Sequence, residues 1–121
     1  MSKLILVVED QEDNRQILRD LLASAGYAMT EAGDGEAALL AVKAQRPDLI
    51  LMDIQLPLLD GYEATRRIKA DPDLRSIPII VVTSYALSGD ETKARAAGCD
   101  AYVTKPYSPR QLLAKIKEFL P

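Results

Sequence analysis

The chain has 121 residues, of which 48% are hydrophobic and 27% charged, a balance typical of one folded domain with its own core. The net charge is −3 and basic residues are scattered, so we expect no direct nucleic-acid binding through a basic surface. With one cysteine, Cys99, and no histidine, an intramolecular disulfide is excluded and a zinc site is disfavoured. The N-terminal segment resembles neither a signal peptide nor a membrane span, so we expect a cytoplasmic protein with no membrane partner.

The first half of the chain alternates strand and helix patterns. Residues 3–8, KLILVV, form a short apolar run that predicts a buried strand. Residues 14–26 place apolar side chains on one helical face and end in a glycine, which predicts a helix. A weaker strand is expected over 27–32, a helix over 33–45 behind a Gly-Asp-Gly turn, and a strand over 48–52.

The second half continues the alternation. Residues 60–71 predict a helix that begins with a capping aspartate and has a glutamate at capping-box spacing. Residues 77–82, IPIIVV, predict a buried strand, and residues 88–98 predict a helix that opens on serine and closes on glycine. A last strand is expected over 101–104, and a last helix over 108–120 that begins with Ser-Pro.

Five strand–helix units with short connections predict an α/β fold, a doubly wound five-stranded parallel sheet with helices on both faces. The strands are continuous apolar runs, as burial on both faces requires. Five such strands suit the flavodoxin-like order 2-1-3-4-5, in which the order reverses between strands one and three. Ligands bind beyond the carboxyl ends of the strands at this reversal. No linker or repeat divides the chain, so we expect one domain over residues 1–121.

Polar side chains follow four of these strands. Glu9 and Asp10 follow the first strand, Asp53 the third, Thr83 the fourth, and Lys105 lies just after the fifth. In the expected strand order, these side chains converge on one crevice. Asp53 directly follows the apolar run LILM, where an unpaired charge costs several kcal/mol to desolvate.

The three carboxylates would repel one another, by on the order of a few kcal/mol per pair at moderate effective dielectric. Mg²⁺ prefers oxygen ligands and often bridges carboxylates to a phosphate, so it would offset this repulsion. Three acids, one Mg²⁺ and Lys105 together carry no net charge. Such a site suits a phosphoryl group: Asp53 could act as a nucleophile that forms an aspartyl-phosphate, while Mg²⁺ and Lys105 stabilise the transferring charge.

Each of these residues also has a simpler structural explanation. Glu9 and Asp10 belong to EDQED, where acids favour the dipole of the following helix and Asp10 or Asp13 can cap it. For this pair alone, we favour the structural explanation. An acid directly after a buried run, such as Asp53, favours function. The other polar residues fit ordinary strand and loop positions, so their joint placement carries the functional interpretation.

Four ordered segments of the chain resemble those of the response-regulator receiver domain, the phosphorylated switch of two-component signalling. VVEDQEDN resembles the family's acid-pair segment, and RPDLILMDIQLPLLDG its phosphoacceptor segment. VVTSYA resembles the segment with the switch hydroxyl, and GCDAYVTKPY the segment with an aromatic residue followed by Lys-Pro. The resemblance covers the whole chain, and the family includes the chemotaxis regulators, which share the flavodoxin-like strand order.

The resemblance implies a metal site and a phosphoacceptor. Glu9 and Asp10 would be the acid pair that holds Mg²⁺. Asp53 would accept the phosphoryl group and also ligate the metal, and the backbone carbonyl of Gln55 would be a further ligand.

The resemblance also implies a switch. Thr83 and the backbone N–H of Ser84 would hydrogen-bond the phosphoryl oxygens, and Lys105 would pair with the phosphoryl group. The bond from Lys105 to Pro106 would be cis. Tyr102 would be the aromatic switch residue that responds to Thr83.

The implied partners are a histidine kinase or phosphotransfer protein as donor and a downstream protein that binds the face of the fourth helix, fifth strand and fifth helix. A receiver catalyses only its own phosphotransfer and dephosphorylation, so we expect no other enzymatic activity. The chain ends directly after the last expected helix, which suggests a stand-alone or an excised receiver. The segment MDIQLP in a lone receiver resembles single-domain regulators of cell-cycle or phosphorelay type.

Two other functions use similar residues. A Mg²⁺-dependent phosphatase of the haloacid-dehalogenase type also has an aspartate nucleophile at a strand end. It has a second acid two residues later as general acid, where this chain has Gln55. A flavodoxin-like cofactor binder needs a phosphate loop rich in Ser, Thr and Gly after the first strand, where EDQEDN would repel a phosphate. Both alternatives are less favoured than the receiver.

Overall fold

The computed structural model describes residues 2–83 and 90–121, and this part of the chain contains five strands and five helices in alternation. The expected role of Ser84 and the expected helix start at residue 88 lie outside the described residues. The strands are β1 Leu4–Val8, β2 Ala28–Ala32, β3 Leu49–Asp53, β4 Ile79–Thr83 and β5 Ala101–Thr104. The helices are α1 Glu12–Ser24, α2 Gly35–Ala44, α3 Gly61–Ala70, α4 Asp90–Ala97 and α5 Pro109–Phe119.

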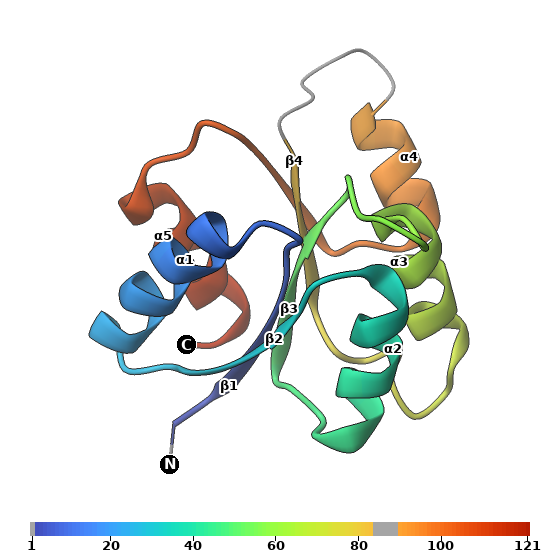
Figure 1. Ribbon diagram of the computed structural model, residues 1–121, viewed down its shortest axis with the longest axis horizontal. Helices are drawn as coiled ribbons and strands as arrows, with labels where there is room; N and C mark the ends of the chain where they lie inside the picture. Colours follow the sequence, from blue (N-terminus) through green and yellow to red (C-terminus); the bar gives the residue numbers. More distant parts are fainter. Residues whose placement is uncertain (1, 84–89) are drawn as a thin grey trace.

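The five strands form one parallel sheet in the order β2-β1-β3-β4-β5, which confirms the predicted fold. Helices α1 and α5 cover one face of the sheet, and α2, α3 and α4 cover the other (Figure 1). In register, Val8 of β1 pairs with Met52 of β3, and Asp53 pairs with Val82 of β4. The carboxyl ends of the three central strands therefore lie side by side at one edge.

The core consists of two clusters of buried apolar side chains, one on each face of the sheet. Ile5 and Val7 of β1 pack with the α1 and α5 side chains, whereas Leu6 and Val8 pack toward α2, α3 and α4. The same alternation runs through β3 and β4. Both faces of each central strand are buried, so these strands read as unbroken apolar runs in the sequence.

Strands β3 and β4 each end one residue later than the sequence predicts, and they also begin one and two residues later, respectively. Asp53 and Thr83 are the last residues of these strands rather than the first residues after them. Their backbones are therefore part of the sheet ladder, and the sheet itself places their side chains. This fixes two predicted site residues on a rigid element.

Among the described residues, side chains cap the starts of three helices, and the caps at Asp60 and Ser108 are the ones that the sequence predicts. The Asp34 carboxylate accepts from the backbone N–H of Ala37, and Asp60 caps α3 in the same way. Ser108 and Gln111 form a capping box at the start of α5. Gly26 follows α1 with φ +88°, a conformation that glycine adopts at little cost. No helix that the structure describes has the length and apolar character needed to cross a membrane.

Candidate functional site

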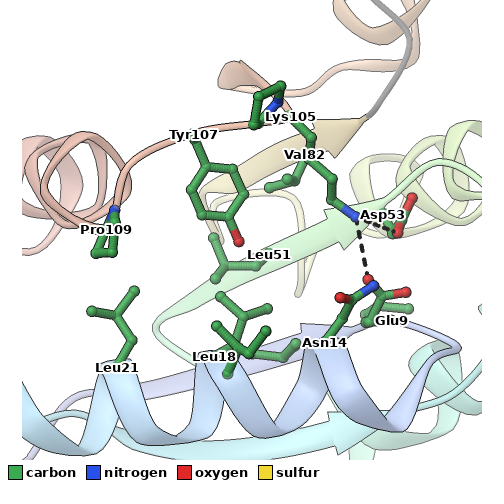
Figure 2. Close-up of a pocket in the computed structure, with 14 residues that line it drawn as sticks. Glu9, Asn14, Leu18, Leu21, Leu51, Asp53, Val82, Lys105, Tyr107 and Pro109 are labelled. Atoms are coloured by element: carbon green, nitrogen blue, oxygen red, sulfur yellow. Dashed lines mark hydrogen bonds and ion pairs between the residues drawn. The ribbon is translucent and has the colours of Figure 1, made fainter.

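Three acids and one lysine meet at the carboxyl edge of the sheet. Glu9, Asp10 and Asp53 each offer a carboxylate oxygen, and these oxygens lie within 4.8 Å of one another. Lys105 Nζ lies 3.3 Å from Glu9 Oε1 and 3.2 Å from Asp53 Oδ2 (Figure 2). The structure thus brings together, from β1, β3 and the segment after β5, the charged residues that the sequence singled out.

Glu9 is the most deeply buried of the three acids, with 3% of its surface exposed. Its backbone N–H donates to the Ala32 carbonyl at 3.0 Å, which extends the pairing between β1 and β2. Lys105 supplies a counter-ion for this buried carboxylate. Burial lowers the pKa of Lys105, but the negative charges of Asp53 and Glu9 raise it by more than burial lowers it. The pKa of Lys105 therefore lies above the ordinary value, and the ammonium is charged at neutral pH.

Asp10 is exposed and lies in the bend between β1 and α1. Desolvation, followed by the hydrogen bond and charge of Glu9, raises the pKa of Asp10, so the cluster disfavours a further negative charge. Helix α1 begins at Glu12, and its N-cap residue is Gln11, whose side chain makes no capping hydrogen bond within the described part of the chain. The alternative in which Asp10 or Asp13 serves as the helix cap is therefore wrong.

Asp53, the last residue of β3, is held at the start of a tight turn, and only 11% of its side chain is exposed. Asp53 Oδ1 accepts from the backbone N–H of Gln55 at 3.0 Å, which holds the carboxylate at the strand end. A Cβ atom at Gly61 would overlap the Asp53 backbone carbonyl, so only glycine lets α3 begin this close to Asp53. The N–H of Gly61 donates to the Ile54 carbonyl at 3.0 Å and closes the turn.

The predicted switch residues lie on β4 and β5. Thr83 is fully buried at the end of β4, and its carbonyl accepts from the Lys105 N–H at 2.6 Å. The Lys105–Pro106 peptide bond is cis. Tyr102 is half-buried on β5 and pairs in register with Val81 of β4. A backbone hydrogen bond therefore joins Thr83 directly to Lys105, just beyond the end of β5, the strand that carries Tyr102.

A pocket of about 530 Å³ opens beside Lys105, between α1 and the segment that leads into α5 (Figure 2). Its walls are mostly apolar, with Leu18 and Leu21 of α1 on one side, and the Tyr107 hydroxyl points into it. Burial raises the pKa of Tyr107, so this hydroxyl is neutral at physiological pH. Asn14 and Tyr107 also lie beside the site and were not predicted from the sequence, although Tyr107 directly follows the Lys-Pro pair.

The three acids fit a magnesium ion. Mg²⁺ binds oxygen ligands at about 2.0–2.1 Å in an octahedron, so its ligands lie about 3 Å to 4 Å apart. The three carboxylate oxygens within 4.8 Å of one another are close to this spacing. Because Asp10 is exposed, water can complete the coordination on the open side. The donor set consists of hard oxygens alone, which suits Mg²⁺ better than a softer metal.

Comparison with known proteins identifies the family. A family model described as the response regulator receiver domain matches residues 5–117. The chain belongs to this family. It is 45% identical over 120 residues to the polar-differentiation response regulator DivK of Brucella anthropi, which covers 99% of this chain and 98% of the relative. The DivK protein of Brucella melitensis is 44% identical over the same length and coverage.

Solved receiver structures share the fold of this chain. The receiver domain of a sensor histidine kinase from Pseudomonas aeruginosa PAO1 superposes with a TM-score of 0.92 at 39% identity, covering 99% of this chain and 98% of that one. That structure is described with a magnesium ion coordinated in the active site cleft. The chemotaxis protein CheY4 of Vibrio cholerae has a TM-score of 0.92 at 26% identity, covering 98% and 99%. The receiver prediction is thus confirmed, and the phosphatase and flavin-binder alternatives gain no support.

Proposed function

We propose that the chain acts over residues 1–121 as a receiver that accepts a phosphoryl group on Asp53 with Mg²⁺ as cofactor. The observation that carries this proposal is the meeting of Glu9, Asp10 and Asp53 around one point, with the Lys105 ammonium beside them. A cluster of like charges that includes a buried carboxylate is costly without a cation and is well suited to bind one.

Glu9, Asp10 and Asp53 would hold the metal, together with the backbone carbonyl of Gln55. When bound, Mg²⁺ supplies positive charge that offsets the repulsion among the carboxylates and the charge that develops on the phosphoryl oxygens. The magnesium in the cleft of the P. aeruginosa receiver supports this assignment.

In the proposed transfer, a carboxylate oxygen of Asp53 forms a bond to phosphorus as the bond from phosphorus to the donor breaks. The electron pair of the broken bond leaves with the donor, such as the imidazole of a phosphorylated histidine. Lys105 Nζ, 3.2 Å from Asp53 Oδ2, is placed to hydrogen-bond a phosphoryl oxygen. Thr83, at the end of the neighbouring strand, would bind another phosphoryl oxygen with its hydroxyl.

The relatives that are named response regulators support a histidine kinase or phosphotransfer protein as the donor. For output, we propose the face formed by α4, β5 and α5. Tyr102 and Gln111 line a groove of about 450 Å³ on this face, between β5 and α5. Movement of the Thr83 hydroxyl toward the phosphoryl group would let the Tyr102 ring turn, and the groove would then change shape for a downstream protein.

Beryllofluoride, which stands in for a phosphoryl group on an aspartate, tests the acceptor without a donor protein. We expect fluorine NMR to show a bound signal for the wild type with Mg²⁺ and none for Asp53→Asn. Asp20→Asn is the matched control, because Asp20 is an exposed acid on α1 outside the cluster. A bound signal that persists in Asp53→Asn, or that does not need the metal, would contradict the assignment.

A further inference from the structure

Arg15 of α1 reaches back to the bend that carries the acid pair. Its Nη1 donates to the backbone carbonyl of Glu9 at 2.6 Å, and its side chain is only 19% exposed. A short hydrogen bond from a guanidinium to a carbonyl is charge-assisted and stronger than a neutral one. Arg15 therefore contacts the backbone between β1 and α1, one peptide away from Asp10.

This contact fixes the orientation of the acid pair. The backbone N–H of Glu9 donates to the Ala32 carbonyl at 3.0 Å, and the backbone carbonyl of Glu9 accepts from Arg15. The peptide that joins Glu9 to Asp10 is planar, so fixing the Glu9 carbonyl also fixes the direction in which the chain continues to Asp10. Mutual repulsion would otherwise drive the two carboxylates apart, and Asp10 is the exposed one of the two.

Arg15 is itself held by two acids outside the site. Its Nη2 lies 2.8 Å from Glu12 Oε2, and its Nε lies 3.2 Å from Glu31 Oε1. Glu12 opens α1 and Glu31 lies on β2, so the guanidinium joins a helix, a strand and the bend. The rigid fork of arginine can donate to several acceptors at once, which lysine cannot match.

We propose that Arg15 is a positioning residue for magnesium, which holds Glu9 and Asp10 in their metal-binding arrangement through the Glu9 carbonyl. This inference rests on the proposed function, which assigns Mg²⁺ to Glu9, Asp10 and Asp53. Arg15 cannot be a ligand, because a guanidinium only donates hydrogen bonds. Its positive charge acts against the binding of a cation, whereas its positioning acts in favour, so the two effects predict opposite results when Arg15 is removed.

Arg19 provides a matched control one turn further along α1. It binds the same two acids, Glu31 at 2.7 Å and Glu12 at 3.2 Å. Its other hydrogen bond in the described part of the chain goes to the Gln16 side chain rather than to the bend. Arg15→Ala and Arg19→Ala therefore remove the same charge from the same acids, but only the first removes the bond to Glu9.

Calorimetric titration with Mg²⁺ tests the inference. We expect Arg15→Ala to weaken Mg²⁺ binding by about 10-fold, the size of effect seen when a residue that orients a metal ligand is removed. Arg19→Ala should bind Mg²⁺ as the wild type does, or slightly more tightly, because it only removes positive charge. Thermal unfolding of both variants without metal will show whether each is folded at the temperature of the titration.

A charge-conserving pair keeps the test decisive even if Arg15→Ala does not fold. Arg15→Lys keeps the charge but cannot span the carbonyl and both acids, so it should weaken Mg²⁺ binding, whereas Arg19→Lys should not. Equal effects at positions 15 and 19, or no effect at either, would overturn the inference. If the wild type binds no Mg²⁺, the proposed function fails together with the inference. If the wild type binds Mg²⁺ and Arg15→Ala and Arg15→Lys bind it equally well, only the inference fails.

Discussion

At the scale of single residues, the site carries more negative than positive charge. Three carboxylates share one lysine, which leaves a formal charge of −2 on Glu9, Asp10, Asp53 and Lys105 together. A divalent cation balances this charge, which ties the electrostatics of the site to its proposed cofactor.

Asp10→Asn should weaken Mg²⁺ binding by at least about tenfold, because it removes a proposed ligand rather than a residue that supports one. The pKa of Asp10 is raised in the fold, so its ionised form is disfavoured and the Mg²⁺-free variant should be slightly more stable than the wild type at neutral pH. This difference should shrink as the pH falls through the raised pKa of Asp10, and it should disappear below the ordinary pKa of 3.8, where the carboxyl is protonated in both the folded and the unfolded chain.

Metal titration and pH-dependent unfolding will test this prediction. Asp13→Asn is the control, since Asp13 is an exposed acid three residues further on and outside the cluster. Unchanged Mg²⁺ affinity in Asp10→Asn would remove Asp10 from the metal site.

Lys105→Ala should still be phosphorylated but should no longer couple phosphorylation to output. It should also lower the stability of the Mg²⁺-free protein by about 1 kcal/mol, a modest value because the side chain is partly exposed. The folded pKa of Lys105 is raised, so its stabilising effect is present below pH 10.5 and is lost as the pH rises through the folded pKa. The gap in stability between wild type and variant should therefore narrow above pH 10.5.

Denaturant unfolding at pH 7 and at pH 11 will measure this gap. Lys115→Ala, which breaks an exposed pair with Glu118 on α5, should cost much less. A constant gap across this pH range would show that Lys105 stabilises the fold through packing rather than charge.

At the scale of the elements, the strand ends position the site and the helix caps fix the connections between them. Parallel strands end at one edge, so residues far apart in the sequence become neighbours without a loop of their own. Glu9 and Lys105 are 96 residues apart in the chain and lie 3.3 Å apart in the fold. Two further short connections, the turn to Gly61 and the capping box at Ser108, set where α3 and α5 begin.

Ser108→Ala removes the capping box of α5 and should lower the free energy of unfolding by about 1 kcal/mol. Ser108→Asp, which keeps an acceptor for the free N–H groups, should restore most of this loss. Chemical denaturation with circular dichroism will measure both variants. An alanine variant as stable as the wild type would show that packing alone fixes the start of α5.

The sequence predicted the element order, the strand order and the charged site residues, because apolar runs and capping signals are local. It placed the ends of β3 and β4 one residue too early, since ladder pairing of Asp53 and Thr83 depends on neighbouring strands. It did not predict the contact of Arg15 with the Glu9 carbonyl. A long side chain among several acceptors can choose its partner only once the tertiary structure places them. The left-handed backbone of Leu58, φ 67°, also has no signal in the sequence, because leucine rarely adopts it.

At the scale of the whole molecule, the sheet separates two cores and joins the site to the proposed output face. The pairing of β4 with β5 and the bond from the Lys105 N–H to the Thr83 carbonyl link the acceptor side of the sheet to Tyr102. A change at the phosphoryl group can therefore reach α4, β5 and α5 through adjacent strands. Allosteric coupling of this kind is typically about 1–3 kcal/mol.

Beryllofluoride with Mg²⁺ should shift the ring signals of Tyr102 in the wild type and much less in Thr83→Ala. NMR of protein with labelled tyrosine rings will show this, with the Tyr102 signals assigned by their loss in Tyr102→Phe. Tyr27, which packs against the opposite core, serves as the internal reference. Equal shifts in wild type and Thr83→Ala would mean that the coupling does not run through the Thr83 hydroxyl.

The central claim is that Asp53 becomes phosphorylated in a reaction that needs the acid cluster and Mg²⁺. Its most direct test is the intact mass of the protein after incubation with acetyl phosphate, a small donor that needs no kinase. We predict the added mass of one phosphoryl group for the wild type with Mg²⁺, and no added mass for Asp53→Asn or for the wild type in excess chelator. An equal added mass in Asp53→Asn, or in the wild type without divalent metal, would contradict the account.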